Sequence, residues 1–174
     1  MRTMSNSGDR VDVIQAEWRR ERPDLDPSPQ RVIGRLHRVG ALLTERLTER
    51  YRAFGLTEGE FDVLASLRRA GAPYERVAGD LADHTMITTG GLSKRVDRLE
   101  ERGLVRRRVE ASDARRRIVH LTNDGKRLID SAFTAHLDNE RALLAQLGEE
   151  DSALLEQVLT RWARILGDHE GGAE

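Results

Sequence analysis

Apolar residues recur at helical spacing over most of the chain. Val11, Ile14 and Trp18 fall three and four positions apart, which predicts a short helix from about Arg10 to Arg20. The prolines that follow predict a linker; these are Pro23, Pro27 and Pro29. The next apolar stripe predicts a long helix that ends at Gly55, and its members are Val32, Leu36, Val39, Leu43, Leu47, Tyr51 and Phe54.

Three shorter helices are predicted in the middle of the chain. Thr57 and Glu60 have the spacing of a capping box, which predicts a helix that stops at Gly71. A weaker apolar pattern predicts a helix over Tyr74–Leu81. After a turn, Thr88 or Thr89 can cap a third helix that runs to Arg102, with Gly103 as its stop.

The spacing changes after this third helix. Two groups of aliphatic residues flank a polar turn: Leu104, Val105 and Val109 before it, and Ile118, Val119 and Leu121 after it. This pattern predicts a two-stranded hairpin that packs on the preceding helices. Thr122 can cap a long helix that ends near Gly148. A last helix carries the stripe Leu154, Leu155, Val158, Leu159, Trp162, Ile165 and Leu166. We therefore predict a mainly α fold with a small β-hairpin wing, the arrangement of a winged helix-turn-helix.

The composition narrows the classes of function. Charged residues make up 34% of the chain and there is no cysteine, so disulfides and thiolate metal sites are excluded. The polar start lacks the core of a signal peptide and no apolar run is long enough to span a membrane, so we expect a cytoplasmic protein. The five histidines lack metal-ligand spacing and no nucleophile or phosphate-loop motif occurs. We expect no metal, no cofactor and no enzyme activity.

The charges are unevenly distributed along the chain. The net charge is −1, but Leu92–Arg117 holds ten basic and five acidic residues. A basic block in an acidic body is typical of a protein that binds nucleic acid, although a solvated helical face gives the same pattern.

The predicted helix from Thr89 to Arg102 is the candidate reader of duplex DNA. Its apolar stripe leaves an opposite face suited to the major groove. Two glycines at its start let the backbone approach phosphates, although they equally indicate a helix that frays or starts late. An arginine at the hairpin tip suits a narrow minor groove; a solvated basic loop is the alternative. The DNA-binding candidates are Thr88, Thr89, Gly90, Gly91, Ser93, Lys94, Arg98, Asp113, Arg115 and Arg116.

Residues 60–121 resemble the core of the MarR family of bacterial regulators. The matching motifs are Leu81-Ala82, Arg95–Val105, Asp113–Arg115, and Leu121-Thr122 with Gly125. The resemblance implies a homodimer that pairs through its terminal helices and binds double-stranded DNA. It also implies that Asp113 and Arg115 brace each other in the wing, where the arginine meets the minor groove.

A narrower resemblance connects the chain to the urate-responsive branch of the MarR family, which adds an N-terminal helix. It is carried by Trp18–Asp26, Gly34–Leu36, Gly59–Leu64 and Thr89–Gly91. It implies a small anionic metabolite as effector, bound by Trp18, Asp62 and Arg95, and by Arg107 from its place in the first wing strand. The residues alone also allow core packing for Trp18 and an Asp62–Arg95 ion pair. For Arg107 they favour a phosphate contact or an exposed strand residue.

Together these patterns predict a ligand-responsive transcriptional repressor. We expect an N-terminal extension over residues 1–29, a long scaffold helix over 30–56, a DNA-binding domain over 57–121 and dimerisation helices over 122–174. The alternative is a constitutive or architectural DNA-binding dimer without a small-molecule effector.

Overall fold

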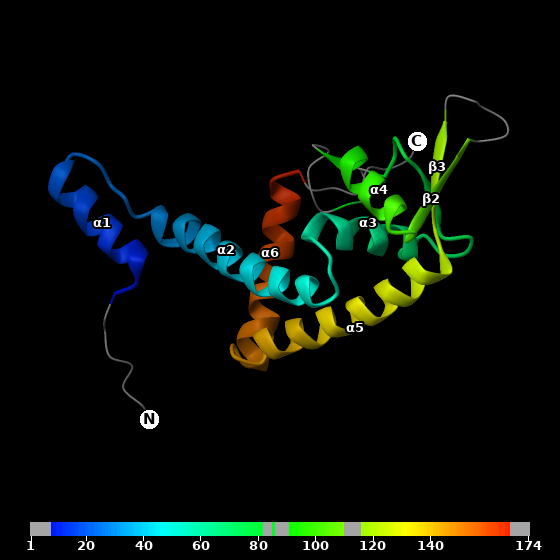
Figure 1. Ribbon diagram of the computed structural model, residues 1–174. Coiled ribbons are helices and arrows are strands. Elements are labelled where there is room, and N and C mark those ends of the chain that lie inside the picture. The colour runs from blue at the N-terminus through cyan, green and yellow to red at the C-terminus, as the bar shows by residue number, and fades with distance from the viewer. Residues whose placement is uncertain (1–7, 82–84, 86–90, 110–115, 168–174) are drawn as a thin grey trace. The chain divides into compact units, whose positions relative to one another are not determined.

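The computed structural model describes residues 8–81, 85, 91–109 and 116–167 (Figure 1). Its elements are α1 (Arg10–Glu21), α2 (Gln30–Ala53), α3 (Glu58–Arg69), β1 (Glu75–Val77), α4 (Leu92–Glu101), β2 (Val105–Val109), β3 (Arg117–Leu121), α5 (Asn123–Leu144) and α6 (Glu149–Ile165). They fall into two compact units, residues 1–49 and 50–174. Among the described helices, none has the length and apolar character needed to cross a membrane.

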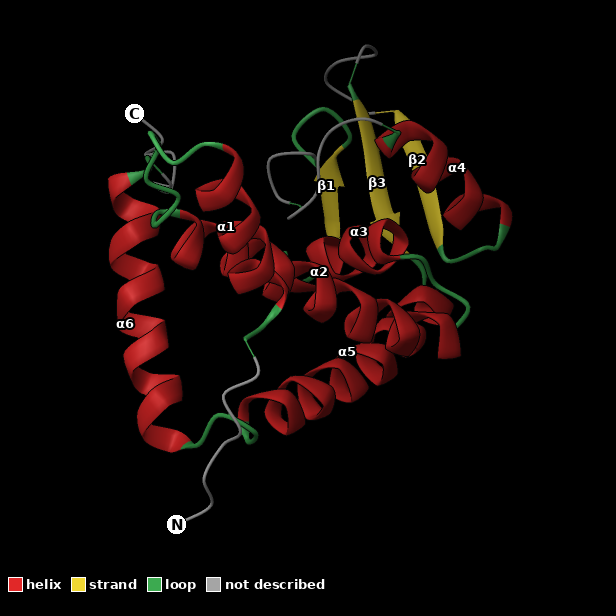
Figure 2. Cartoon of the chain, turned by 90° about the vertical axis from the view of Figure 1, so that its left-hand side faces the viewer, coloured by secondary structure: helices red, strands yellow, loops and turns green. Residues whose placement is uncertain are grey.

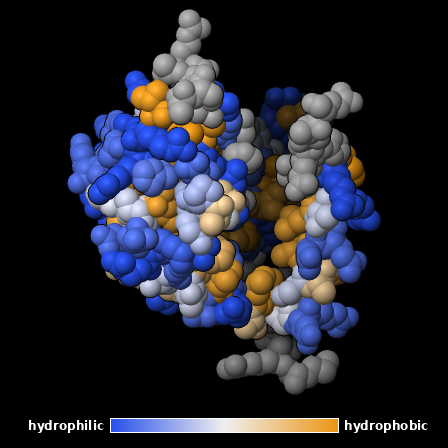
Figure 3. All heavy atoms as spheres, turned by 90° about the vertical axis from the view of Figure 1, so that its right-hand side faces the viewer, coloured by the Kyte–Doolittle hydropathy of each residue, from blue (hydrophilic) through white to orange (hydrophobic). Residues whose placement is uncertain are grey.

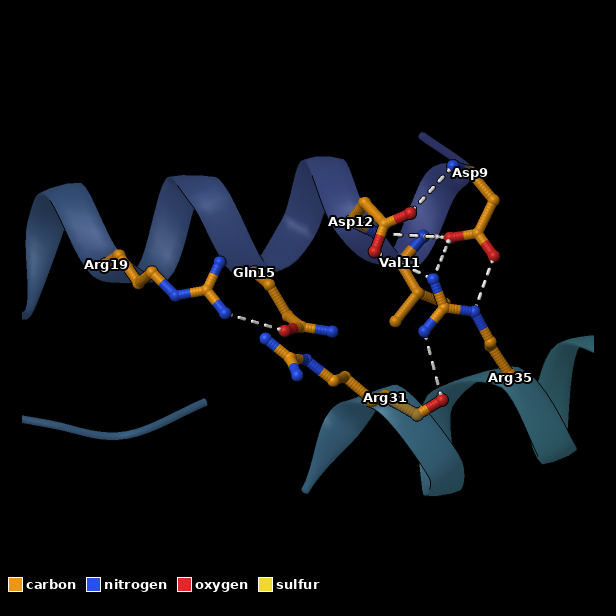
Figure 4. Close-up of polar contacts among 7 residues, drawn as sticks. All are labelled: Asp9, Val11, Asp12, Gln15, Arg19, Arg31 and Arg35. Carbon is orange, nitrogen blue, oxygen red and sulfur yellow. Dashed lines mark hydrogen bonds and ion pairs between the residues drawn. The ribbon is translucent and has the colours of Figure 1, made fainter. Parts of the chain in front are cut away.

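In the first unit, α1 packs on the first turns of α2. Val11 and Gln15 are the buried side chains of α1. Gly34 gives α1 room to approach, because a Cβ there would lie 3.3 Å from a methyl group of Val11. Arg35 Nε donates to Asp9 Oδ2 and Arg35 Nη2 to Asp12 Oδ1, both at 2.7 Å (Figure 4). These bonds connect α2 to the capped first turn of α1. The helix predicted over Arg10–Arg20 is confirmed.

In the second unit, α3 is the central helix. Thr57 and Glu60 form the predicted capping box: the Glu60 N–H donates to Thr57 Oγ1 at 3.3 Å, and the Thr57 N–H to Glu60 Oε2 at 2.9 Å. Val63, Leu64 and Leu67 are fully buried, and the helix contacts α4, α5 and β3. Residues 59–67 of α3 are all buried, so this helix forms the centre of the packing in the second unit.

An aromatic cluster joins the end of α2 to α3 and α5. The Tyr51 ring stacks on Phe61 with centroids 4.1 Å apart, and its hydroxyl lies 3.2 Å from His136 Nδ1. Phe133 also stacks on Phe61, with ring centroids 6.3 Å apart. Burial raises the pKa of Tyr51 to about 12, so its hydroxyl stays neutral at physiological pH.

The sheet has three antiparallel strands in the order β1-β3-β2, where the sequence predicted two. The predicted helix over Tyr74–Leu81 is therefore wrong. Glu75 pairs with His120 and Val77 with Ile118, and the Leu121 N–H donates to the Tyr74 carbonyl at 3.0 Å. This pairing supplies hydrogen-bond partners to the edge of β3 that β2 leaves open, a requirement that outweighs a weak local helical pattern.

The helix α4 lies beside the strands of the wing (Figure 2). It begins at Leu92, after Gly91 in the left-handed region at φ 86°, and Gly91 offers no side-chain cap. Thr88 and Thr89, the predicted caps, lie outside the described residues, and the described helix starts at Leu92, the late start that the two glycines also indicated. Gly103, at φ 69°, follows the end of α4 as predicted. Val96 and Leu99 are the buried residues of α4.

The helix α5 starts at the predicted cap. Thr122 Oγ1 accepts from the Gly125 N–H at 3.0 Å, and the Thr122 N–H donates to the Leu104 carbonyl at 3.1 Å. A Cβ on Gly125 would lie 2.0 Å from that same carbonyl oxygen, so only glycine lets α5 begin against the wing.

Apolar side chains also reach the surface, as Figure 3 shows for one face. No side chain of α6 is buried. The exposed large apolar residues of α2 are Val32, Ile33, Leu36, Val39, Leu42 and Leu43, and those of α6 are Leu154, Leu155, Val158, Leu159 and Ile165.

Candidate DNA-binding surface and ligand site

The outer face of α4 carries the predicted reading residues. Ser93, Lys94 and Arg98 are all exposed on it. Gly91 forms the turn into the helix. The other predicted candidates lie outside the described residues; these are Thr88, Thr89, Gly90, Asp113 and Arg115. The described part of the face is therefore polar and open, as a DNA-reading helix requires.

A groove of about 480 Å³ lies between α4 and the wing strands. Three arginines line it from the strands: Arg107, Arg108 and Arg117. The sequence indicated Arg108 and Arg117 only as members of the basic block, whereas Arg107 was also a candidate for effector binding. Arg108 Nη2 lies 2.8 Å from Glu75 Oε1, and Arg116, a predicted DNA contact, lies 3.8 Å from Asp80. Acids of the β1 segment thus offset part of this positive charge.

Arg107 is bound to α4. Its Nη2 donates to Asp97 Oδ1 at 2.5 Å and to the Ser93 carbonyl at 3.3 Å, and its Nη1 lies 3.4 Å from Glu100 Oε2. Its backbone N–H donates to Glu100 Oε1 at 2.8 Å. The residues alone favoured a phosphate contact or an exposed strand residue for Arg107. The structure instead shows its guanidinium bonded to α4.

Arg95 projects from α4 over the first turn of α3. Its Nη1 is buried and has no hydrogen-bond partner within the described chain. A Cβ on Gly59 would lie 2.3 Å from Arg95 Nε, so the guanidinium occupies the space that this glycine leaves. Asp62 is buried on α3, with an exposed fraction of 9%. The Asp62–Arg95 ion pair that the sequence left open stays a prediction.

Trp18 is not a core residue of its own unit. It is 48% exposed and lines a small pocket of about 200 Å³ with the linker residues Leu25, Asp26, Pro27, Pro29 and Gln30. Core packing, the alternative for Trp18, is therefore wrong within this unit. The ring keeps a face available for contact.

A second pocket, which the sequence did not indicate, lies between α3 and α5. It measures about 510 Å³ and is lined by Ala65, Arg68, Arg69, Ile129, Asp130, Phe133 and Thr134. Hydrogen bonds from Lys126 and Arg68 hold the pKa of Asp130 below its ordinary value, so this carboxylate is charged at neutral pH. An apolar floor with charged residues at the rim could hold a small organic molecule.

Known proteins with similar sequences and structures identify the family. A family model described as MarR family matches residues 54–116. The transcriptional regulator PecS of Dickeya dadantii is 40% identical over 150 residues, which cover 86% of this chain and 90% of PecS.

Two solved MarR-family regulators of Streptomyces coelicolor, AbsC and Sco3205, are each 28% identical and align with a TM-score of 0.71. The alignment covers 83% of this chain and 98% of AbsC, and 86% of this chain and 95% of Sco3205, which was solved in complex with DNA. These relatives are transcriptional regulators, and their fold includes the helices and the wing found here. The chain therefore belongs to the MarR family of winged-helix transcriptional regulators.

Proposed function

We propose that this regulator is a homodimeric repressor that binds a pseudo-palindromic operator and is released by a small anionic metabolite, such as urate or a related purine or carboxylate. The observation that supports an effector site is the buried Nη1 of Arg95, on the reading helix, which has no hydrogen-bond partner within the described chain.

The outer face of α4 and the neighbouring groove support DNA binding. Exposed Ser93, Lys94 and Arg98 can reach base edges and phosphates, and Arg108 and Arg117 add positive charge to the lining of the neighbouring groove. The related Sco3205 was solved with DNA, and we infer that this chain binds duplex DNA through the corresponding surface.

The exposed apolar stripes on α2 and α6 support the homodimer. Each stripe holds at least five large apolar side chains, more than isolated surface residues would explain. Pairing two copies through such stripes gives a two-fold axis, so the half-sites of the operator would lie roughly 10 base pairs apart.

Arg95 supports an anionic effector. A buried N–H without a partner costs about 1–3 kcal/mol, and an anion would supply the missing acceptor. The first turn of α3 beneath the guanidinium also favours negative charge. Asp62 offers an acceptor for ring N–H groups, and its negative charge would repel an anion held by Arg95. Because Arg95 belongs to α4, this repulsion would shift the reading helix and weaken DNA binding.

The test is an operator-binding titration with urate, xanthine and simple aromatic acids. We expect an effector to lower the operator affinity of the wild-type protein at fixed salt. Asp62→Asn should keep operator binding but need far more effector for release, because it removes the like charge. Arg95→Ala should weaken effector binding on the order of thirtyfold, since it deletes a charge-assisted donor worth about 2 kcal/mol.

The outcomes separate the alternatives. An unchanged response in both variants would move the effector site elsewhere, with the pocket between α3 and α5 as the next location to test. A wild-type protein that binds its operator but responds to no effector would favour the constitutive or architectural dimer.

A further inference from the structure

The reading helix carries acidic side chains on the side that faces the wing. Asp97 lies one turn after Ser93, and Glu100 follows on the next turn; their side chains are 52% and 38% exposed. A carboxylate close to a DNA backbone repels it, and the repulsion grows as the intervening water is excluded. A helix that binds DNA therefore needs a cation to offset these two charges.

Arg107 supplies that cation from β2. Its guanidinium reaches Asp97 at 2.5 Å, Glu100 at 3.4 Å and the Ser93 carbonyl at 3.3 Å. The Glu100 carboxylate in turn accepts the Arg107 backbone N–H. One residue of the wing thus binds α4 at three positions spread over two turns.

We infer that Arg107 is a positioning residue that fixes α4 against the wing and cancels the charges of Asp97 and Glu100, and so sets the affinity of the effector-free protein for DNA. This inference rests on the proposed DNA binding. It differs from a ligand-binding role, which would alter release by the effector and leave the operator affinity of the effector-free protein unchanged.

Arg108 is a matched control. It is the next residue of the same strand and carries the same charge, but its guanidinium bonds to Glu75 of β1. Replacing Arg108 therefore removes equal charge from the wing without releasing α4. Any general loss of attraction to DNA affects both variants alike, whereas the loss of the α4 contacts affects Arg107→Ala alone.

The experiment measures operator affinity without effector for Arg107→Ala and Arg108→Ala, each alone and combined with Asp97→Asn. We expect Arg107→Ala to weaken binding about fivefold more than Arg108→Ala, the equivalent of one ion pair of about 1 kcal/mol. Asp97→Asn should restore most of that difference in the Arg107 variant and none in the Arg108 variant. Equal losses without this selective rescue would overturn the inference.

Amide hydrogen exchange tests the same contact without DNA. We expect faster exchange over Leu92–Glu101 in Arg107→Ala than in the wild type, and no change there in Arg108→Ala. This result would support the positioning role of Arg107 independently of DNA binding. A wild-type protein that bound no operator would contradict the proposed function, and not this role. Unchanged exchange over α4 in Arg107→Ala would overturn the inference that Arg107 fixes this helix.

Discussion

Gly59 and Arg95 show how an absent side chain can define a binding group. The glycine lies in the first turn of α3, and the guanidinium fills the volume that a Cβ would take. The sequence allowed two interpretations of Arg95, a residue that binds the effector or the ion-pair partner of Asp62. The role of Gly59 could not be predicted, because it depends on the approach of α4, which is distant along the chain.

Gly59→Ala should expel the Arg95 side chain and leave the fold intact. The arginine is flexible and can turn away, while alanine favours the helix by about 1 kcal/mol over glycine. We expect unchanged or higher thermal stability and a loss of effector response similar to that of Arg95→Ala, measured in the operator titration.

Gly79→Ala serves as its control, because a Cβ there meets nothing within 4 Å. Gly59→Ala with a normal effector response would show that the guanidinium is not part of the effector site.

At the scale of elements, local signals predicted most of the helices. Helix caps and stops depend on a few neighbouring residues, so they can be predicted from the sequence alone. This holds for the caps at Thr57 and Thr122 and for the stop at Gly103. β1 was missed because it becomes a strand by pairing with β3, some forty residues later, and its own residues carry a weak pattern. The sequence left the start of α4 open because a threonine suits a cap chemically, while the glycines there allow the chain a later start.

The junction of α5 with the wing gives a prediction about stability. Gly125→Ala should destabilise the second unit by about 1–3 kcal/mol, because the new methyl group collides with the backbone oxygen of Leu104, which cannot rotate away. Chemical denaturation measures this loss, and Gly79→Ala again provides the control. Equal stability of the two variants would mean that α5 can shift away from Leu104 at no cost.

Arg35 gives a prediction about α1. Arg35→Ala should release the first turn of α1 from α2, because the arginine bonds to both acids of the capped turn (Figure 4). Hydrogen exchange over Arg10–Glu21 should become faster. Arg46→Ala, which removes an exposed guanidinium further along α2 that pairs with Glu49 of the same helix, should leave this exchange unchanged. Equal exchange in both variants would assign the docking to Val11 and Gly34 alone.

At the scale of the whole molecule, the apolar stripes matter most. The sequence predicted them because helical periodicity is visible along a single chain, and the structure shows them exposed on α2 and α6. The partner that covers them cannot be seen in one chain, since pairing of two copies leaves no signal beyond the stripe itself. The homodimer therefore stays a prediction.

Leu159→Glu should shift the protein toward a monomer and reduce operator affinity together with it. Leu159 is 39% exposed on the stripe of α6, and a buried charge at a dimer interface is costly. Sedimentation at micromolar concentration measures the shift. Leu25→Glu, at a 51% exposed position in the linker, is the control and should remain dimeric. A monomeric wild-type protein that still binds DNA tightly would contradict the prediction.

The lack of any buried side chain on α6 also bears on how the protein acquires its stability. Helices in proteins gain most of their stability from packing of an apolar face, so we expect α6 to gain much of its order from the second copy in the proposed homodimer. The ordering of α6 is then coupled to association by mass action, and the midpoint of thermal unfolding should rise with total protein concentration. A cell that dilutes the regulator would lose folded protein along with operator occupancy, and repression would fall more steeply than simple dissociation predicts.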